Sequence, residues 1–335
     1  MKSAAVDLWL APLDRMRVHA YRALGGLARP LVRQRGLRVA VLGSLLVGSS
    51  LAVTVLLPVW LLALGPILWG VPHLVSDVRY MVIRRGYHRR PSVWFAAGIP
   101  LVFAGFGAGV RYGLLAAAGT LVVARGSPTR RVVGLLIVGA LGLGAHRLGA
   151  TADVVFAHAH NFIAVALWWT WRCRADGARL AVPLLLFAAC SWIMLGGVDR
   201  FVLDRDLIGF GPTEMTFASF CWELVPGVQG PLAIRLVLLF AFAQAVHYGV
   251  WMRLIPEEDR ARETPRTFRA TYRALEVDFG RAALWLAGAC ALTFACWSLF
   301  DLAGARHAYL RFALFHGHLE LAAFALWWAE RRAPA

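Results

Sequence analysis

Six histidines lie inside apolar stretches of this 335-residue sequence, where an ionisable side chain is costly. Such residues usually face a partner or a ligand inside a helix bundle, and a neutral imidazole is the commonest protein ligand of a metal ion. We therefore predict that these histidines bind a metal, with helix–helix hydrogen bonding or proton relay as the alternatives. The six are His73, His158, His160, His247, His316 and His318.

Two carboxylates accompany these histidines at helical spacing. Asp77 follows His73 by four residues, and Glu320 follows His316 by four, so each pair lies on one face of a helix. A metal-bound histidine commonly donates its second ring N–H to a carboxylate. Asp77 and Glu320 are therefore the candidate catalytic residues, either as groups that orient the histidines or as direct ligands of iron. Simple pairing of two buried polar groups is the other interpretation.

Four of the histidines form two HxH pairs, at residues 158 and 160 and at residues 316 and 318. Residues i and i+2 point about 200° apart on a straight helix. Either one member of each pair is a ligand, or the pairs serve two centres. Gly317 would permit local unwinding of the second pair.

The elements that must carry these residues are membrane-spanning helices. Hydrophobic residues make up 59% of the chain and charged residues only 16%, too few to cover a soluble domain of this size. The fold class predicted is an all-α, polytopic transmembrane helix bundle of about ten helices. The stretch 112–145 holds two spans that are short for a bilayer, and eight full crossings remain if it is re-entrant. The apolar spans lie near 38–60, 64–83, 92–110, 112–124, 132–145, 150–171, 180–198, 231–252, 281–300 and 309–329.

The histidine-bearing spans are the second, sixth, eighth and tenth, which all run in the same direction across the membrane. Counted from the outer ends of these spans, five of the histidines share one layer, and His247 lies deeper.

The net charge of +16 comes from arginines in short segments between the apolar runs. These basic segments alternate with weakly charged ones, as the positive-inside bias requires, so both termini are predicted to be cytoplasmic. This distribution indicates that the arginines mark the cytoplasmic segments of a protein in a bacterial-type inner (plasma) membrane. It does not favour binding to nucleic acid. The basic segments are the N-terminal arm, 84–90, 125–131, 172–179, 253–269 and the tail at 331–332.

Residues 1–37 are expected to form a basic cytoplasmic arm or an interfacial helix. Residues 38–330 are expected to form one transmembrane domain, with a long outer loop at 199–230 that serves as a lid, a binding element or a surface cover.

The segment WGVPHLVSDVRY (69–80) resembles the G-x-P-H-x-x-x-D element of the Brp/Blh-type membrane carotenoid dioxygenases. Gly70, Pro72, His73 and Asp77 carry the match, and His247 is a rough counterpart of that family's later histidine element. The resemblance implies a multi-helix membrane protein whose histidines hold non-haem iron and which cleaves an apolar substrate such as β-carotene.

The function predicted is that of a membrane-embedded, histidine-ligated metalloenzyme. It would be an oxidoreductase or oxygenase that uses Fe(II) on a lipophilic substrate such as a carotenoid or another lipid. The alternatives are a haem-b electron-transfer protein, with two histidines as axial ligands, and a proton-coupled transporter. The expected partners are the lipophilic substrate and membrane lipid, without nucleic acid.

Overall fold

The computed structural model describes residues 4–171 and 177–330, and no strand occurs among those residues. The predicted all-α class is confirmed. Several apolar helices are typical of a membrane protein, as the composition predicts, while the number of crossings and the side of each terminus stay predictions. Within the described residues, five helical stretches are long and apolar enough to cross a membrane: Arg35–Leu56, Pro58–Ile83, Pro128–Leu148, Gly230–Glu258 and Arg281–Ser298.

Four helices that carry the intramembrane histidines pack against one another in the middle of the bundle. Two of them continue as wider, π-helical turns, α4 into η2 (Val78–Ile83) and α13 into η6 (Val250–Leu254). The short α-helix α14 (Ile255–Glu258) follows η6. Large apolar side chains, including Trp168 and Phe242, are fully buried between the four helices. The four helices are α4 (Pro58–Asp77), α9 (Thr151–Trp171), α13 (Gly230–Gly249) and α18 (Phe315–Glu330).

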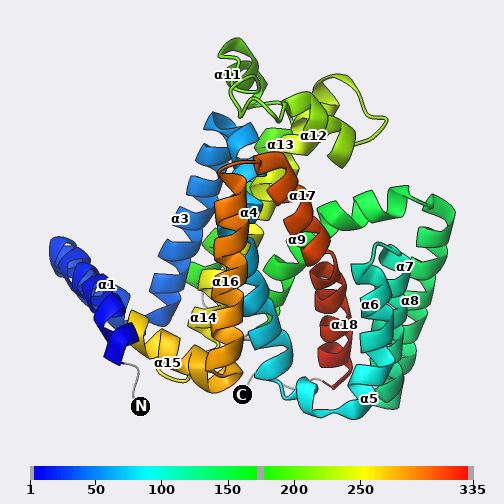
Figure 1. Ribbon diagram of the computed structural model, residues 1–335, viewed down its shortest axis with the longest axis horizontal. Coiled ribbons are helices and arrows are strands. Elements are labelled where there is room, and N and C mark those ends of the chain that lie inside the picture. Colours follow the sequence, from blue (N-terminus) through cyan, green and yellow to red (C-terminus); the bar gives the residue numbers. More distant parts are fainter. Residues whose placement is uncertain (1–3, 172–176, 331–335) are drawn as a thin grey trace.

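Further helices flank this centre on two sides (Figure 1). On one side lie α3 (Arg35–Leu56), η5 (Gly177–Leu180), α10 (Ala181–Met194), α16 (Arg281–Ser298) and α17 (Leu302–Ala313). On the other lie η3 (Tyr87–Arg89), α5 (Pro91–Val93), η4 (Trp94–Gly98), α6 (Ile99–Gly105), α7 (Val110–Val123) and α8 (Pro128–Leu148). Helix α16 buries none of its residues fully and α8 buries two, so both expose apolar surface suited to lipid contact.

Several helix boundaries differ from the predicted spans. The first two spans are separated at Leu57 rather than at 61–63, because Pro58 restricts the residue before it and starts the next helix. The stretch 132–145 belongs to the longer helix α8 and reaches membrane-spanning length. The predicted span 309–329 is two helices, α17 and α18, which meet at Leu314.

The predicted outer loop 199–230 folds into two short helices, α11 (Asp199–Asp204) and α12 (Phe217–Leu224). They lie together at the upper end of the molecule in Figure 1. Helix α12 begins with a reciprocal cap between Thr216 and Ser219 and packs on α13, so its apolar residues cover that end of the bundle.

Buried ion pairs join the helices at the opposite end, where Figure 1 shows α14 and α15 (Phe268–Phe279). Glu257 faces three arginines, with Arg38 at 3.0 Å, Arg253 at 3.2 Å and Arg260 closer still. The next two acidic residues pair likewise, Glu258 with Arg179 and Asp259 with Arg84. Residues 172–176 of the basic segment 172–179, and the basic tail at 331–332, lie outside the described residues.

The N-terminal arm is helical, with α1 (Ala4–Ala23), η1 (Gly25–Leu27) and α2 (Ala28–Arg33). Asp14 ties α1 to the start of α15, because its carboxylate accepts from the Phe268 backbone N–H at 2.7 Å and from Arg269 at 3.0 Å. Trp9 and Met16 remain exposed on α1. That pattern suits the expected interfacial helix, whose contact with the membrane stays a prediction.

Candidate metal centre

Four of the six intramembrane histidines come together where α4, α9, α13 and α18 meet. The ring centroids of His73 and His316 are 5.0 Å apart, those of His316 and His160 5.2 Å, those of His160 and His247 5.2 Å, and those of His247 and His73 5.5 Å. All four contacts are edge-to-face, and His73 and His247 are fully buried. We call this set the histidine quartet.

Backbone carbonyls three or four residues earlier in the chain orient three of the quartet rings. Nδ1 of His73 lies 3.1 Å from the carbonyl oxygen of Trp69, Nδ1 of His160 lies 2.8 Å from that of Ala157, and Nδ1 of His316 lies 2.5 Å from that of Ala313. A carbonyl oxygen only accepts, so each Nδ1 carries the proton and each Nε2 keeps its lone pair. These rings therefore present the tautomer that binds a metal through Nε2.

His247 completes the quartet with both ring nitrogens buried and without a hydrogen-bond partner among the described residues. Its position departs from the expectation that it lies deeper than the other histidines. Helix α4 begins at Pro58, earlier than the predicted start near residue 64, so His73 and His247 lie at similar distances from the starts of α4 and α13.

Asp77 lies on the metal-binding side of His73. Its Oδ2 is 4.0 Å from Nε2 of His73, and the carbonyl of Trp69 holds the other ring nitrogen. The carboxylate therefore does not orient His73 through Nδ1, one of the two roles that the spacing predicts. Ligand atoms of Asp77, His73, His247 and His316 all lie within 4.8 Å of one another, which suits a direct ligand or a charge partner of a bound ion.

Glu320 faces His247 instead of its predicted partner His316. Its Oε1 accepts a hydrogen bond from Nε1 of Trp251 at 2.8 Å and lies 3.6 Å from Nε2 of His247. Nδ1 of His316 already donates to the carbonyl oxygen of Ala313, so that ring proton is not available to Glu320. Trp251 is absent from the predicted site, although it follows His247 by four residues and so shares its helix face.

The two remaining histidines lie outside the quartet. Nε2 of His158 is 2.9 Å from the carbonyl oxygen of Leu224, and its ring packs on Phe240. The ring of His318 stacks on Phe156 at 4.7 Å. One member of each HxH pair therefore joins the quartet, as expected for a regular helix, and α18 stays helical through Gly317 without unwinding.

Two tyrosines lie near the quartet, Tyr248 on α13 against His73 and Tyr309 on α17 against Gly70 of α4. The Tyr248 ring lies 4.5 Å from the His73 ring. A Cβ at Gly70, one turn before His73, would overlap the ring of Tyr309. This close approach is a physical reason for glycine at the first position of the G-x-P-H element.

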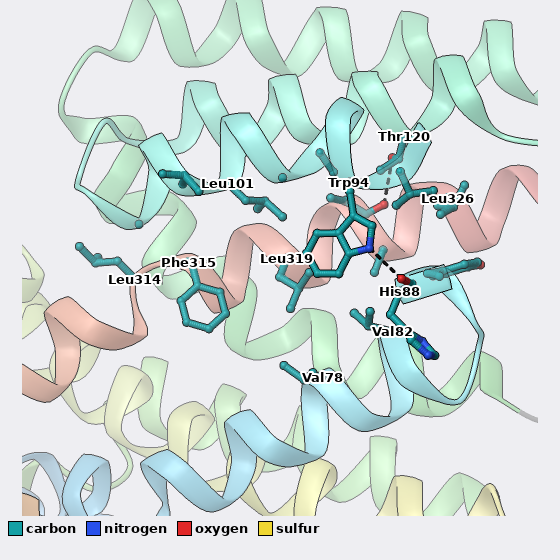
Figure 2. A pocket seen from close by; sticks show the side chains of 18 of the residues that line it. Val78, Val82, His88, Trp94, Leu101, Thr120, Leu314, Phe315, Leu319 and Leu326 are labelled. Carbon is teal, nitrogen blue, oxygen red and sulfur yellow. Dashed lines mark hydrogen bonds between the residues drawn. The ribbon is translucent and has the colours of Figure 1, made fainter. Parts of the chain in front are cut away.

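One cavity adjoins the quartet, and a second cavity adjoins the first. The inner cavity has a volume of about 410 Å³ and includes His160, His316, Asn161, Tyr248, Tyr309 and His318 in its lining. Figure 2 shows the second, which is apolar, has a volume of about 790 Å³ and lies between α18 and the segments η2, η4 and α6. Gly107 and Leu314 line both cavities, which are therefore neighbours.

Comparison of the chain with protein-family models, with curated proteins and with solved structures gives no match. The resemblance to the Brp/Blh-type dioxygenases therefore stays a prediction that rests on Gly70, Pro72, His73 and Asp77.

Proposed function

We propose that this protein is a membrane-embedded metalloenzyme that holds a non-haem iron ion in the histidine quartet. The observation that carries the proposal is a group of ligand atoms, from His73, Asp77, His247 and His316, that all lie within 4.8 Å of one another. The ring of His160 contacts the rings of His247 and His316 beside this group. Nε2 of His73 and both ring nitrogens of His247 are buried without a hydrogen-bond partner among the described residues. Each such atom costs about 1–3 kcal/mol, which metal coordination would offset. Imidazoles with a carboxylate beside them suit Fe(II).

The quartet favours a single ion over haem b. A haem held between two facing histidines needs the plane between them free for its macrocycle. The rings of His247 and His316 face each other across the quartet at 6.0 Å, and the rings of His73 and His160 each contact both of them. Those two rings occupy the space that the macrocycle would need.

Bound iron would supply activation of dioxygen at coordination positions that the protein leaves open. The chain's own residues orient the ligands, through the carbonyls of Trp69, Ala157 and Ala313, and shield His73 and His247 from water by complete burial. The apolar cavity in Figure 2, lined by Val78, Leu101, Phe315 and Leu319 among others, suits the hydrocarbon of a lipophilic substrate such as a carotenoid or another lipid. Such a substrate would enter laterally from the bilayer.

Elemental analysis and an absorption spectrum of the purified protein test this function. We expect stoichiometric iron without the Soret band of a haem. A Soret band would favour the haem-b alternative. Protein that folds but holds no metal after incubation with Fe(II) under anaerobic conditions would favour the proton-coupled transporter.

We also propose that the chain crosses a bacterial-type inner membrane about ten times, with both termini on the cytoplasmic side. The support is the gathering of basic segments at the end of the molecule that holds α14 and α15, away from α11 and α12 (Figure 1). At that end Arg38, Arg84 and Arg179 come from three separate parts of the chain and pair with residues 257–259.

Reporter fusions test the topology. Fusions at Arg90, in a basic segment, and at Asp204, on α11, are expected to report opposite sides of the membrane because the basic segment stays in the cytoplasm. A fusion at Arg125, in another basic segment, serves as the matched control for Arg90. Reporters at Arg90 and Asp204 on the same side would contradict the topology.

A further inference from the structure

The inner cavity holds buried polar atoms that the metal does not use. Asn161 and Tyr309 both line it, and each is only 1% exposed. Oδ1 of Asn161 and the hydroxyl oxygen of Tyr309 have no hydrogen-bond partner among the described residues. A buried polar atom is rarely left unpaired, so these two atoms indicate a ligand with polar groups of its own.

The chemistry that each atom requires is fixed by its neighbours. The amide nitrogen of Asn161 donates to the Ala157 carbonyl at 3.2 Å, which orients the amide and leaves Oδ1 as an acceptor. The Tyr309 ring is held against Gly70, where a Cβ would overlap it. Its hydroxyl can donate or accept. The ligand must therefore carry a donor for Asn161, which an ether or a hydrocarbon lacks.

We propose that the inner cavity binds the hydroxyl group of a lipid alcohol, and that this alcohol is the substrate class of the proposed metalloenzyme. A hydroxyl group can both donate to Asn161 and accept from Tyr309. A carboxylate is disfavoured because Arg306, in the same lining, already pairs with Glu223 at 3.0 Å and donates to the Leu62 carbonyl at 3.0 Å. This inference rests on the proposed function for the role of the quartet, but the hydroxyl site itself stands on Asn161 and Tyr309.

The hydrocarbon tail of the alcohol has a place in the neighbouring cavity. Leu314 lies at the junction of α17 and α18 and lines both cavities, as Gly107 does. Figure 2 shows the apolar side chains that continue from Leu314 and Phe315 toward Leu319 and Leu326 along α18. A hydroxyl group held beside the quartet therefore leaves its tail a short path past Leu314 into an apolar space.

Three probes of equal tail length test the inference on iron-loaded, detergent-solubilised protein: hexadecanol, its methyl ether and hexadecane. We expect hexadecanol to bind at least roughly tenfold more tightly than the other two, because only it carries a donor for Oδ1 of Asn161. Asn161→Leu should reduce the preference over the methyl ether to about twofold or less, because both oxygens can still accept from Tyr309. Tyr309→Phe should reduce the preference over hexadecane, because the alcohol loses a donor that the alkane never used. Tyr272→Phe, on α15 and away from the cavity, is the matched control and should keep the preference.

Equal affinity of the unmodified protein for the three probes would overturn the inference. So would a preference over the ether that survives Asn161→Leu, or a preference over hexadecane that Tyr309→Phe leaves unchanged. Tyr309→Phe conserves ring volume and keeps the test valid if Asn161→Leu fails to fold. Iron content is measured on the same samples. Iron without a preference for the alcohol rejects the inference alone, whereas a preference for the alcohol in protein that cannot hold iron rejects the proposed function alone.

Discussion

Alanine substitution of His160 or His316 is expected to abolish metal binding, whereas the same substitution of His158 or His318 leaves the metal in place. The four positions form two matched pairs, each two residues apart on one helix. His160 and His316 contribute rings to the quartet, while His158 binds the Leu224 carbonyl and His318 stacks on Phe156. Metal stoichiometry of the four purified variants is the measurement. Metal loss in all four, or in none, would contradict the assignment.

The same measurement distinguishes two roles for His73 and Asp77. If they belong to the metal site, His73→Ala removes the metal and Asp77→Asn weakens its binding by roughly 10–100-fold. If the two residues only neutralise each other, both variants keep the metal and lose stability by about 1–2 kcal/mol. Full metal occupancy in His73→Ala would exclude this residue from the site and remove the main support for the resemblance to the carotenoid dioxygenases.

Glu257→Gln is expected to destabilise the protein by about 3–5 kcal/mol, the usual cost of leaving a buried charge without its partner. Glu257 and Arg38 have side chains only 1% and 3% exposed, and Arg260 contacts the same carboxylate. Removing the negative charge leaves the positive charges of these two arginines close together, without a carboxylate to neutralise them, where α3 meets α14. The measurement is the free energy of unfolding in detergent, or the melting temperature where unfolding is irreversible.

The control for Glu257→Gln is an ion pair of the same type at the surface. Arg281 pairs with Glu276 next to the start of α16, and its side chain is 54% exposed. Arg281→Gln is expected to cost less than about 1 kcal/mol, because water screens an exposed pair. A similar loss of stability in both variants would show that burial adds nothing to the pairs of Glu257.

The helical class, the membrane character and the positions of the histidines could be predicted from the sequence because they depend on local composition. A long apolar run in a bilayer must satisfy its backbone hydrogen bonds internally and so becomes helical wherever it lies. The four-residue spacing of His73 and Asp77 likewise places them on one helix face without any tertiary contact. The structure finds these two side chains 4.0 Å apart.

The makeup of the site depended on the tertiary structure. Spacing along one helix does not determine how that helix is rotated about its axis, so it left open which member of each HxH pair turns toward the other helices. The packing of α9 against α13, and of α18 against α9 and α4, directs His160 and His316 inward and places Glu320 beside His247 and Trp251. The carbonyls that orient the rings could not be predicted from the sequence either. Every helical residue has a backbone carbonyl, and the side-chain rotamer of the histidine decides which of them its ring nitrogen binds.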